Sequence, residues 1–216
     1  MIRIGDPNNK QIRFDENTPC VGIIGEIASG KTEAAEFLVN FGKRYFSLYS
    51  IYHLSYSIML DKALLGLNIN NPSRKLKQNL AIFLEDTLPS EGLSLTDCVY
   101  TQLLNVIYIA GVVVSGIRMP HQLERWQALI PHFKSVYIEV SEEIRHTREN
   151  GRREKAFLSP ISLEEFKALH NSDTETGISS MKNKADIVIN NERSLEEFHA
   201  QIIQLIPHYA KEYERK

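Results

Sequence analysis

Short apolar runs alternate along this chain with longer amphipathic stretches, and this alternation predicts both the elements and the fold class. The apolar runs are typical of buried strands, and we expect strands at residues 20–24, 45–48, 111–114, 135–140 and 185–189. The stretches between them have apolar residues at helical spacing, and we expect helices at residues 31–41, 120–130, 142–150, 162–170 and 194–205. Strands that alternate with helices form a parallel sheet covered on both faces. The pattern therefore predicts a three-layer α/β/α fold.

The stretch from residue 51 to residue 110 is helical in pattern and contains two helix-start signals. Ser73 follows an Asn-Pro pair and precedes apolar residues at helical spacing. Ser94 and Asp97 form a Ser-x-x-Asp capping pattern in front of a second such series. We therefore expect helices to begin directly after Ser73 and Ser94.

Turn-forming residues set several further boundaries. Gly42 is placed to end the first helix, and Gly151 indicates a break or hinge in the helix that begins near residue 142. The polar segment 173–177 is expected to be a loop. The first nineteen residues are predicted to form a hairpin extension, because a turn-rich segment separates two short runs, 2–4 and 11–14.

Composition narrows the possible classes of function. A chain of 216 residues is long enough for one α/β domain with a full core, and we expect a single domain over 1–216. The formal net charge of −2 gives no reason to expect a nucleic-acid partner. Cys20 and Cys98 fit neither a disulfide framework nor a zinc site. No apolar stretch approaches the roughly 20 residues that span a membrane, and no signal-peptide core is present, so we expect a cytoplasmic protein.

The most specific motif lies between the first strand and the first helix. It has the pattern G-x-x-x-x-G-K-[ST] and reads Gly25-Glu26-Ile27-Ala28-Ser29-Gly30-Lys31-Thr32. Its glycines let successive backbone N–H groups converge on one anion, and the helix that follows adds its positive dipole end. Lys31 is expected to reach the terminal phosphates, and the Thr32 hydroxyl is expected to ligate Mg²⁺. The motif predicts that the chain binds a nucleoside triphosphate.

The segment after the strand at 111–114 should face this phosphate loop, because ligands of parallel sheets bind beyond the carboxyl ends of the strands. Many phosphate-loop enzymes have an acidic residue there that holds Mg²⁺ or its water shell. This chain has the uncharged Ser115 at that place, and Arg118 follows it. Arg118 could bind a phosphate or carboxylate of an acceptor, and the alternative is a surface arginine after a turn.

A second cationic group lies at residues 145–153. Arg145, Arg148 and Arg152 are spaced by three and four, so they share one face if the helix continues that far. Arginines that close over a transferring phosphoryl group stabilise its charge. The alternative interpretation is a solvated helix face with glutamate partners, for which Glu142, Glu143 and Glu149 are available.

Together these landmarks resemble a family. The phosphate loop with its helix, the segment Val-Val-Val-Ser-Gly-Ile-Arg, the arginine-rich stretch and the late segment Ala-Asp-Ile-Val-Ile-Asn-Asn are similar to the small phosphate-loop kinases of the nucleoside monophosphate kinase group. The resemblance is greatest to the dephospho-CoA-kinase-like and phosphomevalonate-kinase-like branch, and it covers roughly residues 20–205. Of these motifs, only the phosphate loop is highly specific.

The resemblance implies a five-stranded parallel sheet, a helical acceptor-binding region at about 50–110 and a small arginine-bearing lid at about 145–160. It implies that Mg²⁺ and ATP are bound and that the γ-phosphoryl group passes to a small phosphorylated or hydroxylated acceptor. In this interpretation Arg118 orients the acceptor, and Arg148 and Arg152 close over the transferring group. Asn190 and Asn191 would line the adenine edge.

The chain departs from the family pattern at two places. Relatives usually have Asp-Gly-Ile-Arg where this chain has Ser115-Gly116-Ile117-Arg118, which leaves Ser115 and Thr32 as the candidate metal ligands. Relatives also tend to have Asp and Arg after the second strand, where Ser50 and His53 align as candidate acceptor-binding residues.

Three hypotheses follow from the sequence. The leading one is an ATP-dependent kinase that acts on a nucleotide-like or phosphorylated acceptor. The second, motivated by Ser115, is a catalytically weak ATP-binding protein with a regulatory or scaffold role. The third is a nucleotide hydrolase or switch, which is less favoured because no water-orienting residue is evident near Gly116.

Overall fold

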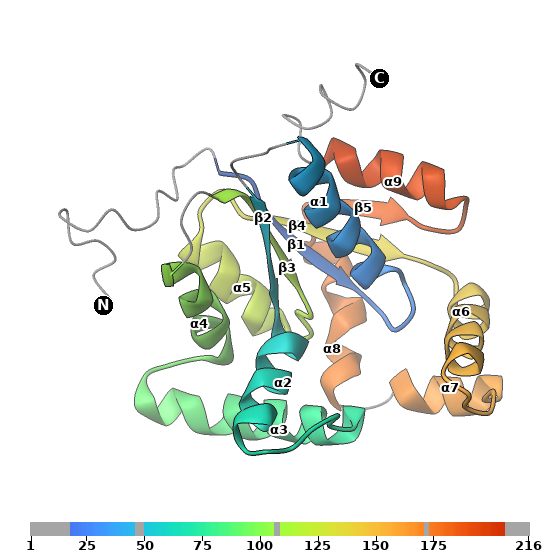
Figure 1. Cartoon of the computed structure of the whole chain (residues 1–216), viewed down its shortest axis with the longest axis horizontal. Coiled ribbons are helices and arrows are strands. Elements are labelled where there is room, and N and C mark those ends of the chain that lie inside the picture. The colour runs from blue at the N-terminus through green and yellow to red at the C-terminus, as the bar shows by residue number, and fades with distance from the viewer. Residues whose placement is uncertain (1–17, 46–49, 106–108, 171–172, 206–216) are drawn as a thin grey trace.

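A five-stranded parallel sheet forms the centre of the computed structural model, which describes residues 18–45, 50–105, 109–170 and 173–205 (Figure 1). The strand order is β2-β3-β1-β4-β5, and the strands are β1 (Cys20–Gly25), β2 (Ser50–Ser55), β3 (Ile109–Ser115), β4 (Lys134–Glu139) and β5 (Ile187–Asn190). Each neighbouring pair is parallel. Because β1 is the middle strand, the loop that follows it lies between the loops that follow β3 and β4.

Helices cover both faces of this sheet. They are α1 (Lys31–Tyr45), α2 (Tyr56–Gly66), α3 (Arg74–Thr87), α4 (Leu95–Tyr100), α5 (Pro120–Leu129), α6 (Glu142–Lys155), α7 (Leu163–His170), α8 (Asp173–Ser180) and α9 (Leu195–Gln204). On one face α1 and α9 bury Leu38 and Phe198 against the strands. On the other face α4, α5 and α8 bury Leu95, Trp126 and Ile178. The predicted three-layer α/β/α fold is confirmed.

The end of the first helix was predicted wrongly, and residues 51–55, predicted to belong to a helical stretch, form a strand instead. Helix α1 continues through Gly42 to Tyr45, and β2 begins at Ser50. Residues 46–49, which include most of the predicted strand, lie outside the described residues. A Cβ at Gly42 would lie 2.7 Å from Cγ1 of Ile51 on β2, so this glycine permits close packing of helix on strand and does not end the helix.

Two predicted breaks are also helical in the structure. Helix α6 passes through Gly151, where an added Cβ would meet nothing within 4 Å. The segment 173–177, predicted to be a loop, forms the start of α8. A Cβ at Gly177 would lie 3.0 Å from the carbonyl oxygen of Arg118, so the absence of a side chain lets α8 pack against the segment that follows β3.

Both predicted helix starts between residues 51 and 110 are confirmed. Ser73 accepts a hydrogen bond from the backbone N–H of Leu76 and caps α3. Ser94 and Asp97 form a reciprocal capping box at the start of α4. The predicted hairpin at residues 1–19 falls almost wholly outside the described residues. Among those that are described, no helix has the length and apolar character needed to span a membrane.

Candidate active site

The phosphate loop connects β1 to α1 at the carboxyl edge of the sheet. Its backbone takes up left-handed conformations at Ala28, with φ of 61°, and at Gly30, with φ of 104°. A Cβ at Gly30 would lie only 2.4 Å from Nδ2 of Asn191. The same Nδ2 donates a hydrogen bond of 2.8 Å to the carbonyl oxygen of Ser29. The loop therefore folds back on itself as its sequence predicts, and a buried asparagine that follows β5 supports it from behind.

Lys31 lies in the first turn of α1, and its Nζ donates to the carbonyl oxygen of Glu26 at 2.6 Å. Burial, followed by the nearby charges of Arg118, Arg74 and Arg145, lowers the pKa of Lys31 to about 7, although the Glu26 carboxylate opposes this shift. So many cations around one amine create a strongly positive region. An anionic ligand bound here would offset the repulsion between Lys31 and the neighbouring arginines.

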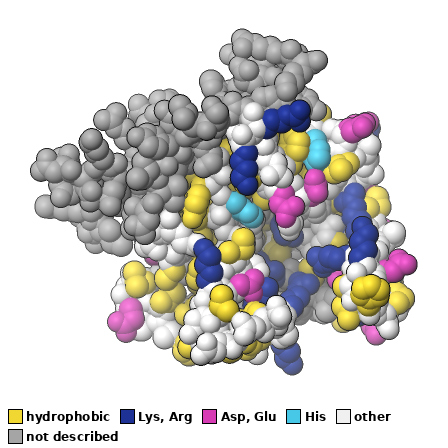
Figure 2. Space-filling view, in the orientation of Figure 1, with side chains coloured by type: hydrophobic (Ala, Val, Ile, Leu, Met, Phe, Trp, Pro, Cys, Tyr) yellow, Lys and Arg dark blue, Asp and Glu magenta, His cyan; other side chains and the backbone are white. Residues whose placement is uncertain are grey.

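A cavity of about 530 Å³ opens in front of the loop and extends to α2 and α3. Loop residues 27–32 form one wall, and residues 55–57 with the first turns of α3 form the opposite wall. Lys and Arg side chains gather around a hollow on this face of the molecule (Figure 2). The cationic lining residues are Lys31, Arg74, Lys77, Arg118, Arg148 and Arg152.

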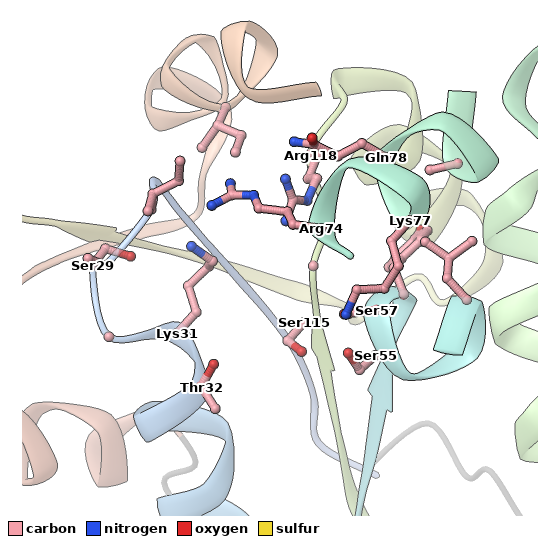
Figure 3. A pocket seen from close by; sticks show the side chains of 18 of the residues that line it. Ser29, Lys31, Thr32, Ser55, Ser57, Arg74, Lys77, Gln78, Ser115 and Arg118 are labelled. Carbon is pink, nitrogen blue, oxygen red and sulfur yellow. The ribbon is translucent and has the colours of Figure 1, made fainter. Parts of the chain in front are cut away.

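The structure brings Arg118 to the cavity as predicted, and it adds Arg74, which sequence reasoning missed. Arg118 follows β3 and Arg74 is the first residue of α3, and Figure 3 shows both side chains extending into the space opposite Lys31. Burial, followed by the charge of Arg74, lowers the pKa of Arg118 to about 10. Ser73 gave a usable signal for Arg74, because an N-cap serine places the next residue in the first turn of a helix.

The three arginines of α6 have different surroundings. Arg145 is 5% exposed, and its Nη2 lies 2.9 Å from Oε2 of Glu26 in the phosphate loop. Arg148 and Arg152 line the cavity. Nη2 of Arg148 donates to the carbonyl oxygen of Asn191 at 2.8 Å, and Arg152 forms an ion pair with Glu149. The glutamate-paired alternative therefore applies to part of this cluster, while two arginines still face the cavity.

Ser50 and His53 were expected to follow the second strand, but both lie within it. Ser50 begins β2 at the end of the sheet away from the cavity, and His53 lies inside the strand opposite Val113. Tyr56 and Ser57 directly follow β2 and line the cavity. The predicted placement failed because the strand itself was placed about five residues too early.

His53 has a different connection to the site. Its Nε2 lies 2.7 Å from Oγ of Ser115, a hydrogen bond in which either group can donate. Ser115 ends β3 and lines the cavity, whereas His53 is not among the lining residues. Burial lowers the pKa of His53, although Glu36 opposes this shift. A serine hydroxyl with an imidazole behind it thus occupies the strand end where the family pattern has a carboxylate.

Asn190 ends β5 opposite Glu139 of β4, and Asn191, the next residue, lies behind the phosphate loop. The backbone N–H of Asn191 donates to the carbonyl oxygen of Glu139, and its side chain is bound to Ser29. The carbonyl oxygen of Asn190 accepts from Gln201. Neither asparagine is among the residues that line the cavity, and their role at an adenine edge stays a prediction.

Comparisons with known proteins agree on the architecture. No family model and no curated protein matches the chain. Among solved structures, a gluconokinase from Sinorhizobium meliloti 1021 matches with 10% identity and a TM-score of 0.53, over 91% of this chain and 95% of that one. The Mycobacterium tuberculosis APS kinase, in complex with AMPPNP and APS, matches with 18% identity and a TM-score of 0.52, over 88% and 98%. The chain has the P-loop kinase fold.

A third solved structure supports the same fold and does not indicate a particular substrate. TT1252 from Thermus thermophilus is 18% identical, with a TM-score of 0.55 over 88% of this chain and 98% of that one. At such identities the likeness concerns the P-loop kinase fold alone.

Two unpartnered buried atoms in this P-loop kinase fold point to a ligand. In the part of the chain that the structure describes, three buried side-chain polar atoms lack a hydrogen-bond partner: Ser29 Oγ, Arg148 Nη1 and Gln102 Nε2. The first two belong to residues that line the cavity. Leaving a buried polar atom unpaired costs about 1–3 kcal/mol. A ligand rich in oxygen atoms would satisfy both.

The cavity is suited to a Mg²⁺ ion whose ligands come mainly from a bound triphosphate. Within the described ranges, no group of three or more His, Cys, Asp or Glu side chains could hold a metal alone. Mg²⁺ at nucleotide sites keeps several waters and takes oxygens from the phosphates plus one or two from the protein. Thr32 and Ser115 both line the cavity and supply hydroxyl oxygens. These residues fit a metal that arrives with a triphosphate.

Proposed function

We propose that this protein is an ATP-dependent kinase that transfers the γ-phosphoryl group to a small nucleotide-like or phosphorylated acceptor. The observation that carries the proposal is a single cation-lined cavity that joins the phosphate loop to a second wall formed by α2 and α3. A nucleotide-binding protein without a second substrate needs only the first wall. A cavity of about 530 Å³ lies within the 300–1,000 Å³ range of small-molecule sites.

Each wall has a distinct task in this proposal. The backbone of the loop and Lys31 would bind the β- and γ-phosphates, and the Thr32 hydroxyl would ligate Mg²⁺. Mg²⁺, when bound, neutralises the charge on the phosphate oxygens. Arg118 orients the acceptor, while Arg148 and Arg152 reach in from α6 toward the transferring group. Positioning and charge stabilisation supply most of the catalysis of phosphoryl transfer.

The first test is nucleotide binding, measured by calorimetry with AMPPNP and Mg²⁺. We expect the wild type to bind and Lys31→Met to lose at least about tenfold in affinity, because a charge-assisted contact to phosphate is worth about 1.5–3 kcal/mol. Lys43→Met is the matched control, since Lys43 lies on the same helix with an exposed side chain. No binding by the wild type would refute the proposal.

A second candidate function is a catalytically weak ATP-binding regulatory protein. The observation that favours it is the neutral Ser115 at the end of β3, hydrogen-bonded to His53. The discriminating experiment compares phosphoryl-transfer and ATPase rates of the wild type and Ser115→Asp. A gain of tenfold or more supports the regulatory function, because a carboxylate then restores what the site lacks. A loss shows that the serine belongs to a working kinase site.

A further inference from the structure

The connection from α6 to α7 presents two apolar side chains to solvent. Phe157 is 98% exposed, and Leu158 beside it is exposed as well. Phe157 has a φ of 56°, in the left-handed region, at a place after a helix where glycine is usual. A phenylalanine at this position gains almost nothing from burial and takes up a conformation that costs free energy. The folding of the chain therefore does not account for this residue.

The backbone around these two residues, which we call the apolar tip, is nevertheless held in place. The N–H groups of Phe157 and Leu158 donate at 2.9 and 2.8 Å to carbonyl oxygens in the last turn of α6, which is the Schellman arrangement. The side chain of Asn150 on α6 bonds both the N–H and the carbonyl oxygen of Ile161. An apolar protrusion with a conformation fixed in advance loses little entropy on binding, so the tip is suited to anchor a contact.

A second pocket, of about 380 Å³, lies at the C-terminal end of α3 and the start of α5, and the proposed phosphoryl transfer makes no use of it. Its lining includes the apolar side chains of Ile82, Pro89 and Met119. The carboxylates of Glu85 and Asp86 also line it, and Asp86 is exposed. An apolar cavity of about 150 Å³ can hold a benzene molecule, so this pocket has room for the side chain of a phenylalanine.

The tip and the pocket are complementary, but they lie at opposite ends of α3. The exposed Lys155 stands two positions before Phe157, and the pocket is acidic. Helix α6 lies near the first residue of α3, since the charge of Glu149 acts on the pKa of Arg74. Figure 1 shows α7 toward this end of α3 and α4 toward the other end. A helix of 14 residues is about 21 Å long, so the tip does not reach the pocket of its own chain.

Helix α3 itself offers an unpartnered apolar face between the two. None of its 14 residues, all of which the structure describes, is buried, and Leu76 and Phe83 are exposed. A two-fold axis that crosses the middle of α3 would set the α3 helices of two copies antiparallel. Each tip would then lie at the end of the other copy's α3 where the pocket is. Such a contact is the same on both copies and closes at the dimer.

We propose that the apolar tip, α3 and the acidic pocket together bind a second copy of this chain. Phe157 of each copy occupies the pocket of the other copy, and Lys155 lies against Asp86. The opposite charges of the tip and the pocket favour this occupant and set the orientation of the two copies. The proposal concerns assembly, and it does not depend on the proposed kinase function.

The first test is sedimentation equilibrium of the full chain over a range of concentrations. We expect a dimer in the wild type and a dissociation constant about tenfold or more higher in Phe157→Gly, because a buried aromatic anchor is lost. Glycine suits the left-handed backbone at this position, so a folding defect would not explain that loss. Circular-dichroism melting of the dilute protein should show a monomer at least as stable as the wild type. Leu195→Ser, which removes an exposed leucine from α9, is the control and should leave the dimer unchanged.

The second test reverses the charges. Lys155→Glu and Asp86→Lys should each weaken the dimer by about threefold or more, and the double variant should recover most of the loss. A zero-length carbodiimide cross-link between Lys155 and Asp86 should join labelled to unlabelled chains when the two are mixed, as mass spectrometry would show.

Four results would overturn the proposal. They are a wild type that stays monomeric at millimolar concentration, a dimer that Phe157→Gly leaves intact, a double charge variant without recovery, and oligomers that grow beyond the dimer.

Discussion

Gly30 shows how closely one residue can determine the shape of a phosphate site. Its φ of 104° lies where side chains are strained, and an added Cβ would meet Nδ2 of Asn191 at 2.4 Å. We predict that Gly30→Ala destabilises the fold by about 1–3 kcal/mol and weakens AMPPNP binding by about tenfold or more, because Asn191 must release Ser29. Denaturant unfolding and calorimetry measure these effects.

Gly66→Ala is the control for this prediction. Gly66 ends α2, and a Cβ there would meet nothing within 4 Å. We expect this variant to keep its affinity and to change stability by less than about 1 kcal/mol. Unaltered AMPPNP affinity in Gly30→Ala would show that the loop tolerates a side chain at this position.

Residues could be predicted from the sequence where a motif fixes both chemistry and place. Lys31, Thr32 and Arg118 line the cavity because a phosphate loop and a strand end bring them there. The contact of His53 with Ser115 spans 62 positions, and it depends on the pairing of β2 with β3. No local sequence pattern indicates how β2 pairs with β3, so this contact could not be predicted from the sequence.

At the scale of elements, Asp97 connects two helices and should make stability depend on pH. Its Oδ2 accepts from the backbone N–H and hydroxyl of Ser94, and its Oδ1 accepts from Nε and Nη2 of Arg125 on α5, at 2.9 and 2.6 Å. Burial acts to raise the pKa of Asp97, but the bonds from Arg125 and Ser94 outweigh it, and the pKa is lowered. The charged form is therefore favoured in the folded state.

We predict that Asp97→Asn lowers the free energy of unfolding by about 1–3 kcal/mol at pH 7. The folded pKa lies below the unfolded value of about 3.9, so the contribution is complete above that pH and is lost as pH falls through the folded pKa. The difference between wild type and variant should accordingly shrink in acid. Denaturant unfolding from pH 7 to pH 3 checks this, with the exposed Asp86→Asn as control. A difference that stays constant down to pH 3 would contradict it.

Elements were predicted well where caps and apolar runs agree, and poorly where a glycine was taken as a boundary. Ser73 and Ser94 cap helices as expected. Gly42, taken as the end of the first helix, lies inside α1, where an added Cβ would come within 2.7 Å of Cγ1 of Ile51. Packing between elements thus requires a glycine at position 42, whereas Gly151 lies inside α6 with open space around it. A single sequence cannot distinguish them from glycines that end helices.

At the scale of the molecule, the residues that line the cavity are spread along the chain from Ile27 to Ile178. A ligand bound there would therefore contact segments that are far apart in the sequence. Any ligand that binds only the folded state stabilises it, by about 2.7 kcal/mol at one hundred times its Kd. For a protein of this size we predict that AMPPNP with Mg²⁺ raises Tm by roughly 5–10 °C. Circular-dichroism melting curves test this. Lys31→Met should lose most of the shift and Lys43→Met should keep it, and an unshifted wild type would contradict the prediction.

The bond between Trp126 and Tyr56 has an optical consequence. The chain has one tryptophan, which is fully buried, and its Nε1 donates at 3.0 Å to the Tyr56 hydroxyl, while Tyr56 itself lines the acceptor side of the cavity. Indole emission is sensitive to such a neighbour. Phosphate added after AMPPNP should therefore change the intrinsic fluorescence more than AMPPNP does alone, and Tyr56→Phe should abolish the difference. The protein's own tryptophan would thus follow the binding of the proposed acceptor in real time, without an added label.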